Sequence, residues 1–402
     1  MKALSGIRVV DFSWAAAVPF GTFLLALMGA EVIKIESRKR PDILRGVEVL
    51  LGWGKPDLDS SPIFFSLSLN KKSLSIDITH PKAKKVIFDL IKISDVVVEN
   101  FSPGVMKRLG FSYEEIRKVK PDIIMLSSSF GGQEGPEAKF LGYAPIFGAM
   151  GGVSYLTGYP DERPSDIRAP SDLISAASAM FALMSALYHR ERTGEGQYID
   201  VSSREVLSSL VGDSILDYIL NGRVQERCEN RDDVMAPHNL YPCKGRDRWI
   251  SIAIKDDEEW ESLLEAMGNP EWGREERFSD PYLRWENQDE LDKLISAWTI
   301  NHDAFELTRM LQERGIAAFP SMSNRDLFED PHLRERGHII KVKPKKIREF
   351  ECFFAPWRFS STPPVVETPG PLLGEHNYYV LKELLGYSDE EVRELEEEGV
   401  LE

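Results

Sequence analysis

The stretch IRVVDFSWAAAVPFGTFLLALMGAEVIKI, residues 7–35, indicates the architecture of the first part of the chain. Residues 7–12 and 31–35 are short, β-branched runs typical of buried strands. Residues 19–28 between them have the length and the leading proline of a helix. A strand, a helix and a second strand predict a βαβ unit with a right-handed crossover in a parallel sheet. The turn after the first strand lacks GxGxxG, so the pattern does not predict dinucleotide binding.

The alternation continues along the chain, with strands expected at 73–78, 96–99 and 123–127 and helices at 81–93, 103–109 and 113–118. The uncharged run 13–30 has the composition of a signal peptide. However, Asp11 precedes it, and Pro19 and Gly21 interrupt it. We therefore expect a buried helix between two strands.

Composition excludes several classes of function. The chain has 402 residues, 42% of them hydrophobic and 28% charged, which is typical of a soluble globular protein of two domains. Its net charge of -16 argues against a nucleic-acid partner or an anionic membrane surface. Its three cysteines are far apart and form no CxxC. We therefore expect reduced thiols, a cytoplasmic location and no metal site.

Two polar segments, 223–233 and 324–330, have the composition of linkers. Between them we expect a strand at 249–254, helices at 257–267, 287–299 and 304–314, and a strand at 315–320. The predicted organisation is a large domain beginning with 1–222, a smaller α+β domain with its flanking linker at 223–323, and a return to the large domain at 324–402. A helix is expected over 205–222, and an acidic, solvated helix over 387–401.

A long helix rich in alanine and serine follows a single acid, Asp172. Pro170 favours the helix start, and Gly194 and Gly196 favour its end. By position alone, Asp172 is more often an N-cap than a functional acid. The motifs in the surrounding sequence favour a functional role for Asp172.

Short motifs along nearly the whole chain together resemble the class III CoA-transferases, the family of formyl-CoA transferase and carnitine CoA-transferase. They include residues 4–12 (LSGIRVVDF), 29–36 (GAEVIKIE), 70–73 (NKKS), 97–104 (VVENFSPG), 192–202 (RTGEGQYIDVS), 330–333 (DPHL), 359–363 (FSSTP) and 373–376 (LGEH). The resemblance implies a Rossmann-like parallel sheet in the large domain, with the smaller domain inserted before the C-terminal return. It also implies an interlocked dimer, either of two copies or with a related subunit.

In this family the acid before the small-residue helix is the nucleophile, and that position falls on Asp172. The resemblance implies that its carboxylate attacks an acyl-CoA to give an aspartyl anhydride. CoA thiolate then forms an aspartyl-CoA thioester, and the acceptor acid reverses the sequence. Backbone N–H groups of residues 131–135 or 151–152 are candidate oxyanion donors. No metal or prosthetic group is required, and coenzyme A enters only as a substrate.

An acidic protein must gather positive charge locally to hold the phosphates of CoA. Open α/β sheets bind ligands at the carboxyl ends of their strands. Solvated surface is the ordinary alternative for each basic residue. The candidate CoA contacts, from these considerations and the resemblance, are Arg38, Asn70, Lys71, Lys72, Ser73, Asn100, Phe101, Lys107 and Arg108.

Two other functions compete with CoA transfer. The α-methylacyl-CoA racemases share the fold but use a histidine where this chain has Tyr143, which counts against an isomerase. An inactive partner subunit of a hetero-oligomeric transferase has no need of Asp172.

One missing feature narrows the choice of substrates. Formyl-CoA transferases have a glycine-rich loop, whereas residues 228–237 of this chain contain no glycine. Residues 12–17 resemble the succinyl-CoA:benzylsuccinate CoA-transferase branch. We therefore expect succinyl-CoA or a similar donor and a partly apolar acid acceptor, with an acceptor pocket formed by Trp14, Phe20, Tyr143 and Phe147.

Overall fold

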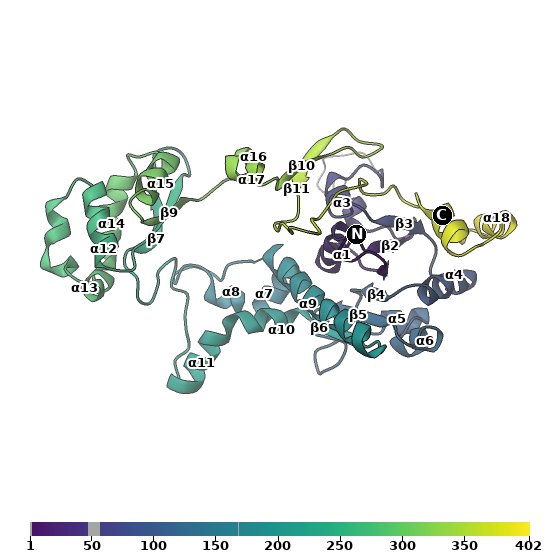
Figure 1. Ribbon diagram of the computed structural model, residues 1–402. Helices are drawn as coiled ribbons and strands as arrows, with labels where there is room; N and C mark the ends of the chain where they lie inside the picture. Colours follow the sequence, from purple (N-terminus) through teal and green to yellow (C-terminus); the bar gives the residue numbers. More distant parts are fainter. Residues whose placement is uncertain (1, 47–56, 168) are drawn as a thin grey trace. The chain divides into compact units, whose positions relative to one another are not determined.

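The computed structural model describes residues 2–46, 57–167 and 169–402. Within them, six parallel strands form the main sheet in the order β3-β2-β1-β4-β5-β6 (Figure 1). The strands are β1 (Arg8–Asp11), β2 (Glu31–Glu36), β3 (Lys72–Ser75), β4 (Val96–Glu99), β5 (Ile124–Ser129) and β6 (Tyr198–Ser202). This is the doubly wound Rossmann order, so the predicted α/β class is confirmed. The order reverses between β1 and β4.

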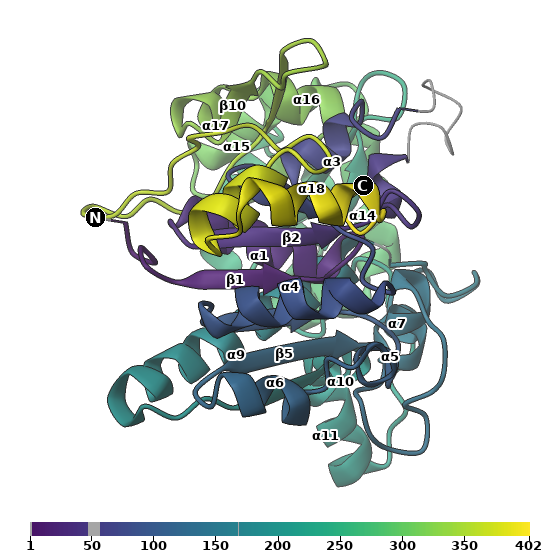
Figure 2. The same cartoon turned by 90° about the vertical axis from the view of Figure 1, so that its right-hand side faces the viewer.

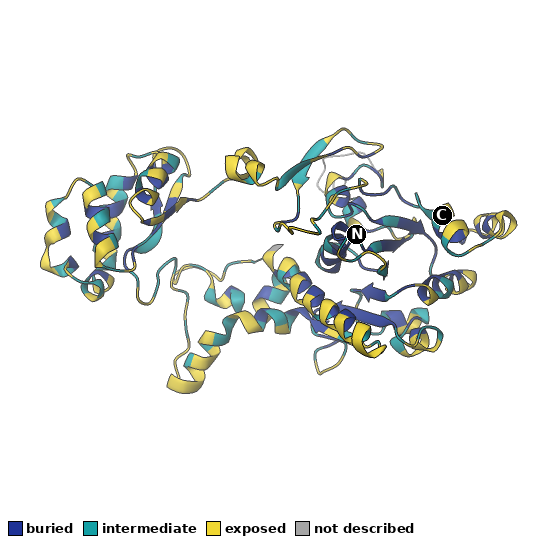
Figure 3. Ribbon diagram, in the orientation of Figure 1, coloured by how far each residue is buried: buried dark blue, intermediate teal, exposed yellow. Residues whose placement is uncertain are grey.

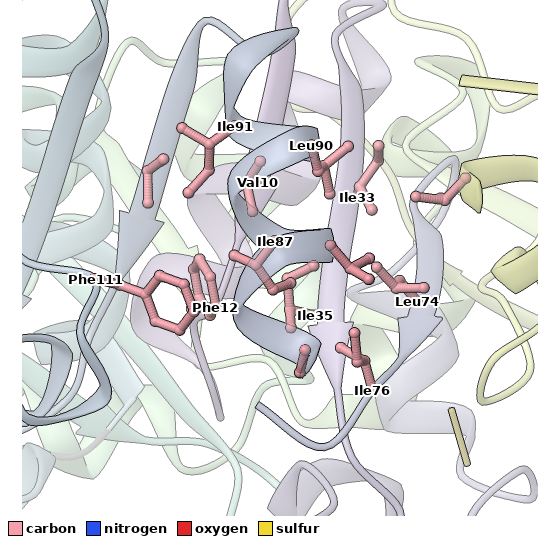
Figure 4. Close-up of a cluster of buried hydrophobic side chains, with 14 of the residues drawn as sticks. Val10, Phe12, Ile33, Ile35, Leu74, Ile76, Ile87, Leu90, Ile91 and Phe111 are labelled. Atoms are coloured by element: carbon pink, nitrogen blue, oxygen red, sulfur yellow. The ribbon is translucent and has the colours of Figure 1, made fainter. Parts of the chain in front are cut away.

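Helices cover both faces of the sheet, which explains why its strands read as continuous apolar runs. On one face lie α4 (Pro81–Lys92), α5 (Val105–Leu109), α6 (Tyr113–Val119), the π-helical turn η5 (Tyr379–Leu384) and α18 (Asp389–Glu397). Figure 2 looks onto this face, with α4 and α18 in front of the strands. Ile87, Leu90 and Ile91 of α4 pack on strand residues such as Val10 and Ile33 (Figure 4).

The opposite face is covered by α1 (Ala17–Leu27) and α9 (Ala169–Thr193). Ala179, Leu183 and Ala186 of α9 are buried in this second core. By length and hydropathy Pro170–Thr193 is the one helix in the described ranges that passes as a membrane span. Its packing on α1 and the strands is that of a core helix. The turn after it requires glycine, since a Cβ at Gly196 would lie 2.2 Å from the carbonyl oxygen of Ile123.

The chain divides into two compact units, and the smaller comprises residues 155–165 and 223–333. It contains the antiparallel sheet β7 (His238–Pro242), β8 (Trp249–Ala253) and β9 (Ala317–Pro320). Its helices are α12 (Asp257–Ala266), α13 (Pro281–Glu286), α14 (Gln288–Thr299), α15 (Ala304–Gln312) and α16 (Asn324–Glu329). Residues 155–165 were placed in the large domain by the sequence analysis, and the predicted domain boundaries stay a prediction.

Two predicted elements differ from the structure. The helix expected over 205–222 is broken into α10 (Ser203–Ser208), the 3-10 turn η2 (Ser209–Val211) and α11 (Gly212–Asn221). Glycine weakens a helix interior, and Gly212 stands at this break. The predicted linker 324–330 contains α16, because Ser323 and Asp326 form a capping box that starts a helix there.

The remaining elements complete the larger unit and its connections. They are η1 (Ile43–Arg45), α3 (Pro62–Ser66), α7 (Ala144–Met150), α8 (Val153–Leu156), α17 (Pro331–Glu335) and the hairpin of β10 (Ile339–Val342) and β11 (Phe350–Phe353). Val342 and Phe350 of the hairpin pack with Phe23 and Leu27 on the outer side of α1.

Candidate active site

The carboxyl edge of the main sheet gathers the segments that the sequence analysis singled out. Helix α1 follows β1, and α9 precedes β6 and runs antiparallel to it, so both helices begin at this edge. The loops after β1, β2 and β4 begin there too. The order reverses between β1 and β4, and open α/β sheets bind their ligands at such a point.

Two of the predicted CoA contacts meet the β1 loop at this reversal point. The Trp14 backbone N–H donates to Asn100 Oδ1 at 2.8 Å, and Asn100 Nδ2 donates to the Trp14 carbonyl at 2.8 Å. The Trp14 ring meets the Phe101 ring edge-on, with 5.8 Å between centroids. The next residue, Ala15, has φ +60°, a left-handed conformation that costs a non-glycine residue about 1 kcal/mol. The β1 loop is therefore held in one shape from the β4 side.

A buried ion pair also holds the β1 loop in place. Lys34 Nζ donates to the Ser13 carbonyl at 2.6 Å and lies 2.9 Å from Asp42 Oδ2. Both side chains are fully buried. Burial opposes the charge of Lys34, but the carboxylates of Asp42 and Asp11 outweigh it and raise the pKa of Lys34. Asp42 Oδ1 in turn accepts the backbone N–H of Ala15 at 3.2 Å. The left-handed residue is thus tied to a carboxylate of the buried ion pair.

Lys71 belongs to this interior network and not to the surface. Its Nζ donates to the Pro19 carbonyl at 2.9 Å, to Thr22 Oγ1 at 2.8 Å and to Asp11 Oδ2 at 3.3 Å. Burial lowers the pKa of Lys71 to about 8. An ammonium group enclosed in this way is not available to a phosphate, so the expectation that Lys71 contacts CoA is not supported by its geometry.

Asn70, Lys72 and Ser73 also have structural partners. Asn70 Oδ1 accepts the backbone N–H groups of Glu367 and Thr368 at 2.7 and 3.0 Å. Lys72 Nζ lies 4.0 Å from the centroid of the Tyr379 ring, and the Ser73 hydroxyl donates to Glu36 Oε2 at 2.7 Å.

These residues lie at or before the start of β3, whereas ligands bind where parallel strands end. In the parallel register Lys72 pairs with Ile33, three residues before Glu36 at the end of β2. Lys72 thus stands at the start of its strand, away from Arg38, whereas Ser73 reaches Glu36 through its hydroxyl. The role of Asn70, Lys72 and Ser73 as CoA contacts stays a prediction.

The other predicted cations do lie at the carboxyl edge. Arg38 follows β2, its side chain is exposed, and its backbone N–H donates to Glu402 Oε2 at 2.6 Å. Lys107 and Arg108 are exposed on α5, which follows β4. The positive charges available to an anionic ligand at this edge thus flank the reversal point from both sides.

Asp172 lies in the first turn of α9, where the helix dipole favours a negative charge. The helix begins at Ala169, so Asp172 is not its N-cap. The Ser171 hydroxyl donates back to the Ile167 carbonyl at 3.0 Å. Asp172 is half-buried, and desolvation raises the pKa of its carboxyl group. Ser175, one turn further on, has a buried hydroxyl without a hydrogen-bond partner in the described structure.

The two glycine segments differ in their surroundings. The Gly151 N–H donates to the Phe147 carbonyl at 2.8 Å, and a Cβ at Gly151 would lie 2.6 Å from Leu207 Cβ. The Gly151 N–H is therefore already bonded within the helix, which disfavours Gly151 as an oxyanion donor. The loop 131–135 follows β5 at the carboxyl edge, with Gly132 left-handed at φ +81°. It remains the better candidate.

One buried acid at this edge was missed by the sequence analysis. Glu99 ends β4 and is 2% exposed. Burial raises its pKa to about 7. The signal in the sequence was an acid closing an apolar run, Val96 to Val98, at the end of a predicted strand.

Comparison with known proteins identifies the class. The sequence model of CoA-transferase family III matches residues 4–377, so the chain belongs to this family and is a CoA-transferase that uses CoA thioesters as substrates. The resemblance inferred from the motifs is thereby confirmed.

Individual relatives cover the whole chain. It is 34% identical over 402 residues to the succinyl-CoA–D-citramalate CoA-transferase of Chloroflexus aurantiacus, covering 100% of this chain and 98% of that protein. It is 33% identical over 400 residues to the alpha subunit of succinyl-CoA–L-malate CoA-transferase from Chloroflexus aurantiacus, covering 99% and 92%. The crystal structure of a CAIB/BAIF family protein from Brucella suis matches with a TM-score of 0.86 and 29% identity, covering 95% and 99%.

Proposed function

We propose that this enzyme moves CoA from succinyl-CoA, or a similar short acyl-CoA, to a carboxylic acid through covalent intermediates on Asp172. The observation that carries the proposal is the position of Asp172 in the first turn of α9, at the same edge of the sheet as the β1–β4 reversal point. Arg38, Lys107 and Arg108 supply positive charge at that edge.

The reaction uses a carboxylate as nucleophile because a thiolate is a good leaving group. An Asp172 oxygen attacks the thioester carbonyl, the C–S bond breaks and CoA thiolate leaves, giving an aspartyl anhydride. The thiolate attacks the aspartyl carbonyl, which releases the first acid and leaves an aspartyl-CoA thioester. The acceptor carboxylate attacks that thioester to form a second anhydride. Attack by the thiolate on the acceptor carbonyl then yields the new acyl-CoA and restores Asp172.

Partial burial suits Asp172 to this role. A carboxylate that has lost part of its hydration has a raised pKa and is a stronger nucleophile than one in bulk water. The N-terminal dipole of α9 keeps the group ionised between turnovers. Water must be excluded during transfer, since an anhydride open to water would hydrolyse.

The substrate pair is supported by the names of the relatives and by aromatic side chains. Both relatives described above are named for succinyl-CoA as donor. Trp14 lies at the reversal point, and Phe147 on α7 stacks on Phe130 at 5.6 Å. These rings favour an acceptor acid with an apolar part.

A panel of acceptors tests this assignment. We expect turnover of succinyl-CoA with one of malate, citramalate or benzylsuccinate to exceed turnover with oxalate by at least about a hundredfold, since a missing or misplaced substrate contact costs a few kcal/mol. The measurement is the rate of new acyl-CoA formation by chromatography. Formyl-CoA with oxalate as the best pair would overturn the proposed substrates.

The opposite positions of Arg38 and Lys72 give a paired test of CoA binding. Arg38→Glu should weaken CoA binding about tenfold or more, and the deficit should shrink as salt is raised from about 50 to about 200 mM. Lys72→Glu changes the net charge equally but lies at the other edge of the sheet, so it should bind CoA like the wild type. Calorimetric titration measures both. Equal effects of the two variants would contradict a site at the carboxyl edge.

We also propose that the active enzyme is a dimer, of two copies or with a related subunit. Large apolar side chains are exposed on α9 and α11, among them Phe181, Tyr188, Ile219 and Leu220 at 76, 60, 66 and 76% (Figure 3). Such a surface is typical of a partner contact. Sedimentation should give twice the chain mass of 45.6 kDa for a homodimer, and a stable, active monomer would overturn the proposal.

A further inference from the structure

Glu99 lies between β4 and β5 of the main sheet, at the turn that follows β4. It is the last residue of β4, and it pairs in register with Ser127 on β5, whose hydroxyl donates to its carboxylate. Its Oε2 accepts the backbone N–H of Phe101 at 2.7 Å. A side chain that is 2% exposed and accepts from two sides is held firmly in place. The transfer chemistry on Asp172 makes no use of it.

The contacts of Glu99 continue to the β1 loop. By holding the Phe101 N–H, Glu99 fixes the turn that follows β4. In this turn Asn100 makes two hydrogen bonds of 2.8 Å with the backbone of Trp14, and the Phe101 ring packs against the Trp14 ring. A carboxylate on β4 thus determines how the turn after β4 meets the loop after β1.

We propose that Glu99 is a positioning residue that sets the shape of the CoA-binding edge at the β1–β4 reversal point, through the Asn100–Phe101 turn and Trp14. The inference rests on the proposed function, because it assumes that CoA binds at this edge. Glu99 acts through the turn and is not itself a contact of the substrate.

The protonation state of Glu99 follows from its surroundings. Burial raises its pKa to about 7, although the hydrogen bonds from Ser127 and Phe101 oppose this shift. In the described part of the chain, the titratable groups that face it are Asp200, whose charge adds to the rise, and Tyr198, both on β6.

The ionised form of Glu99 fits its two donors best. A carboxylate accepts hydrogen bonds more strongly than a neutral carboxyl group. Protonation also converts one acceptor oxygen to a donor, which then competes with Ser127 or Phe101. Burial outweighs these two hydrogen bonds, however, so the folded turn binds the proton of Glu99 more tightly than the solvated chain does. Stability of the turn is therefore fully present below the ordinary carboxyl pKa and is lost as the pH rises through about 7. CoA affinity should fall as the pH rises through the same range.

Three variants test the proposal. Glu99→Leu removes both acceptor oxygens and should weaken CoA binding at about pH 6 by roughly tenfold, with a larger effect on KM for acyl-CoA than on kcat. Glu99→Gln retains one oxygen for the Phe101 N–H, so it should bind CoA within about threefold of the wild type. Ser127→Ala removes a donor to the ionised form, and the pH at which affinity is half lost should rise.

The pH profile separates positioning from a purely structural role. CoA affinity of the wild type, measured by calorimetry from about pH 6 to about pH 8, should decline toward alkaline pH more steeply than that of Glu99→Gln, whose side chain stays uncharged. Titration of the CoA phosphate is common to both proteins and cancels in the comparison. Identical profiles for the two proteins, or wild-type affinity in Glu99→Leu, would overturn the proposal.

Failure of the inference can be told apart from failure of the proposed site. Amide hydrogen exchange in the unliganded enzyme does not depend on where CoA binds. In the peptides containing Trp14 and Phe101, exchange should be faster in Glu99→Leu than in the wild type. If Arg38→Glu binds CoA normally, the proposed site is wrong. If Arg38→Glu weakens binding but Glu99→Leu changes neither exchange nor affinity, only the role of Glu99 is wrong.

Discussion

The Asp172→Asn variant should lose transferase turnover by several orders of magnitude while its melting temperature stays nearly unchanged. An amide cannot form the aspartyl anhydride, so the variant has no route to the covalent intermediates. The helix keeps its length, because Asp172 is inside the first turn of α9 and is not the N-cap. Loss of the favourable charge–dipole interaction should cost at most about 1 kcal/mol. Steady-state kinetics and thermal unfolding of the same preparation measure the two effects.

A trapping experiment identifies the residue directly. Hydroxylamine added with succinyl-CoA should inactivate the wild type by converting the activated aspartyl group to a hydroxamate. Mass spectrometry should find the label on the peptide that contains Asp172. Asp161→Asn, a change of an exposed acid in the smaller unit, is the matched control and should be labelled and inactivated like the wild type. Near-normal turnover by Asp172→Asn, or a label on another peptide, would exclude this mechanism.

The local elements of the fold were predictable because each has its own signal in the sequence. Residues 7–35 contain both strands and the helix of the first βαβ unit, and the structure has β1, α1 and β2 there. The break between α10 and α11 depends on a single glycine in an otherwise helical pattern, which weakens a helix without forbidding it. The helix α16 was missed because a capping box was read only as polar linker composition.

The site was harder to predict because its contacts are non-local. Trp14 and Asn100 are 86 residues apart in sequence, and only the strand order brings β1 beside β4. The motif 70–73 was predicted as a binding segment from its charges and from the resemblance to the family. Sequence alone does not say that β3 begins at Lys72, or that the Lys71 side chain lies in the interior.

The buried network beneath the β1 loop leads to a second large effect, this time on stability. Asp11 is fully buried, and burial opposes its charge. Lys71 and then Lys34 outweigh this, so that the pKa of Asp11 is lowered. Asp11→Asn would leave these two ammonium groups facing a neutral amide. We expect the free energy of unfolding to fall by about 3–5 kcal/mol, since removing one partner leaves an uncompensated buried charge.

Lys71→Met should cost less than Asp11→Asn, because Lys34 remains to neutralise Asp11. The pKa of Lys71, lowered to about 8, also shows that its burial as a cation is unfavourable. The double variant Asp11→Asn/Lys71→Met should therefore be more stable than Asp11→Asn alone, which is the outcome expected when both members of a buried pair are replaced. Urea unfolding of the four proteins at about pH 7 gives the coupling free energy.

The pH dependence of stability distinguishes the two partners because each acts in its own pH window. The carboxyl group of Asp11 has a folded pKa below its unfolded value, so its contribution is present above about pH 4 and is lost as the pH falls. Lys71 acts in the alkaline range, where its charge, unlike that of Asp11, is unfavourable in the folded state. Between about 8 and its ordinary value of 10.5, the unfolded chain binds more protons than the folded one, and stability should rise with pH in that window. Lys71→Met should lose this rise.

Lys72→Met, at the neighbouring lysine over the Tyr379 ring, should keep the rise and change stability by less than about 1 kcal/mol. If Lys72→Met flattened the alkaline profile as Lys71→Met does, or if Asp11→Asn unfolded at the wild-type urea concentration, the network would not be what holds the β1 loop.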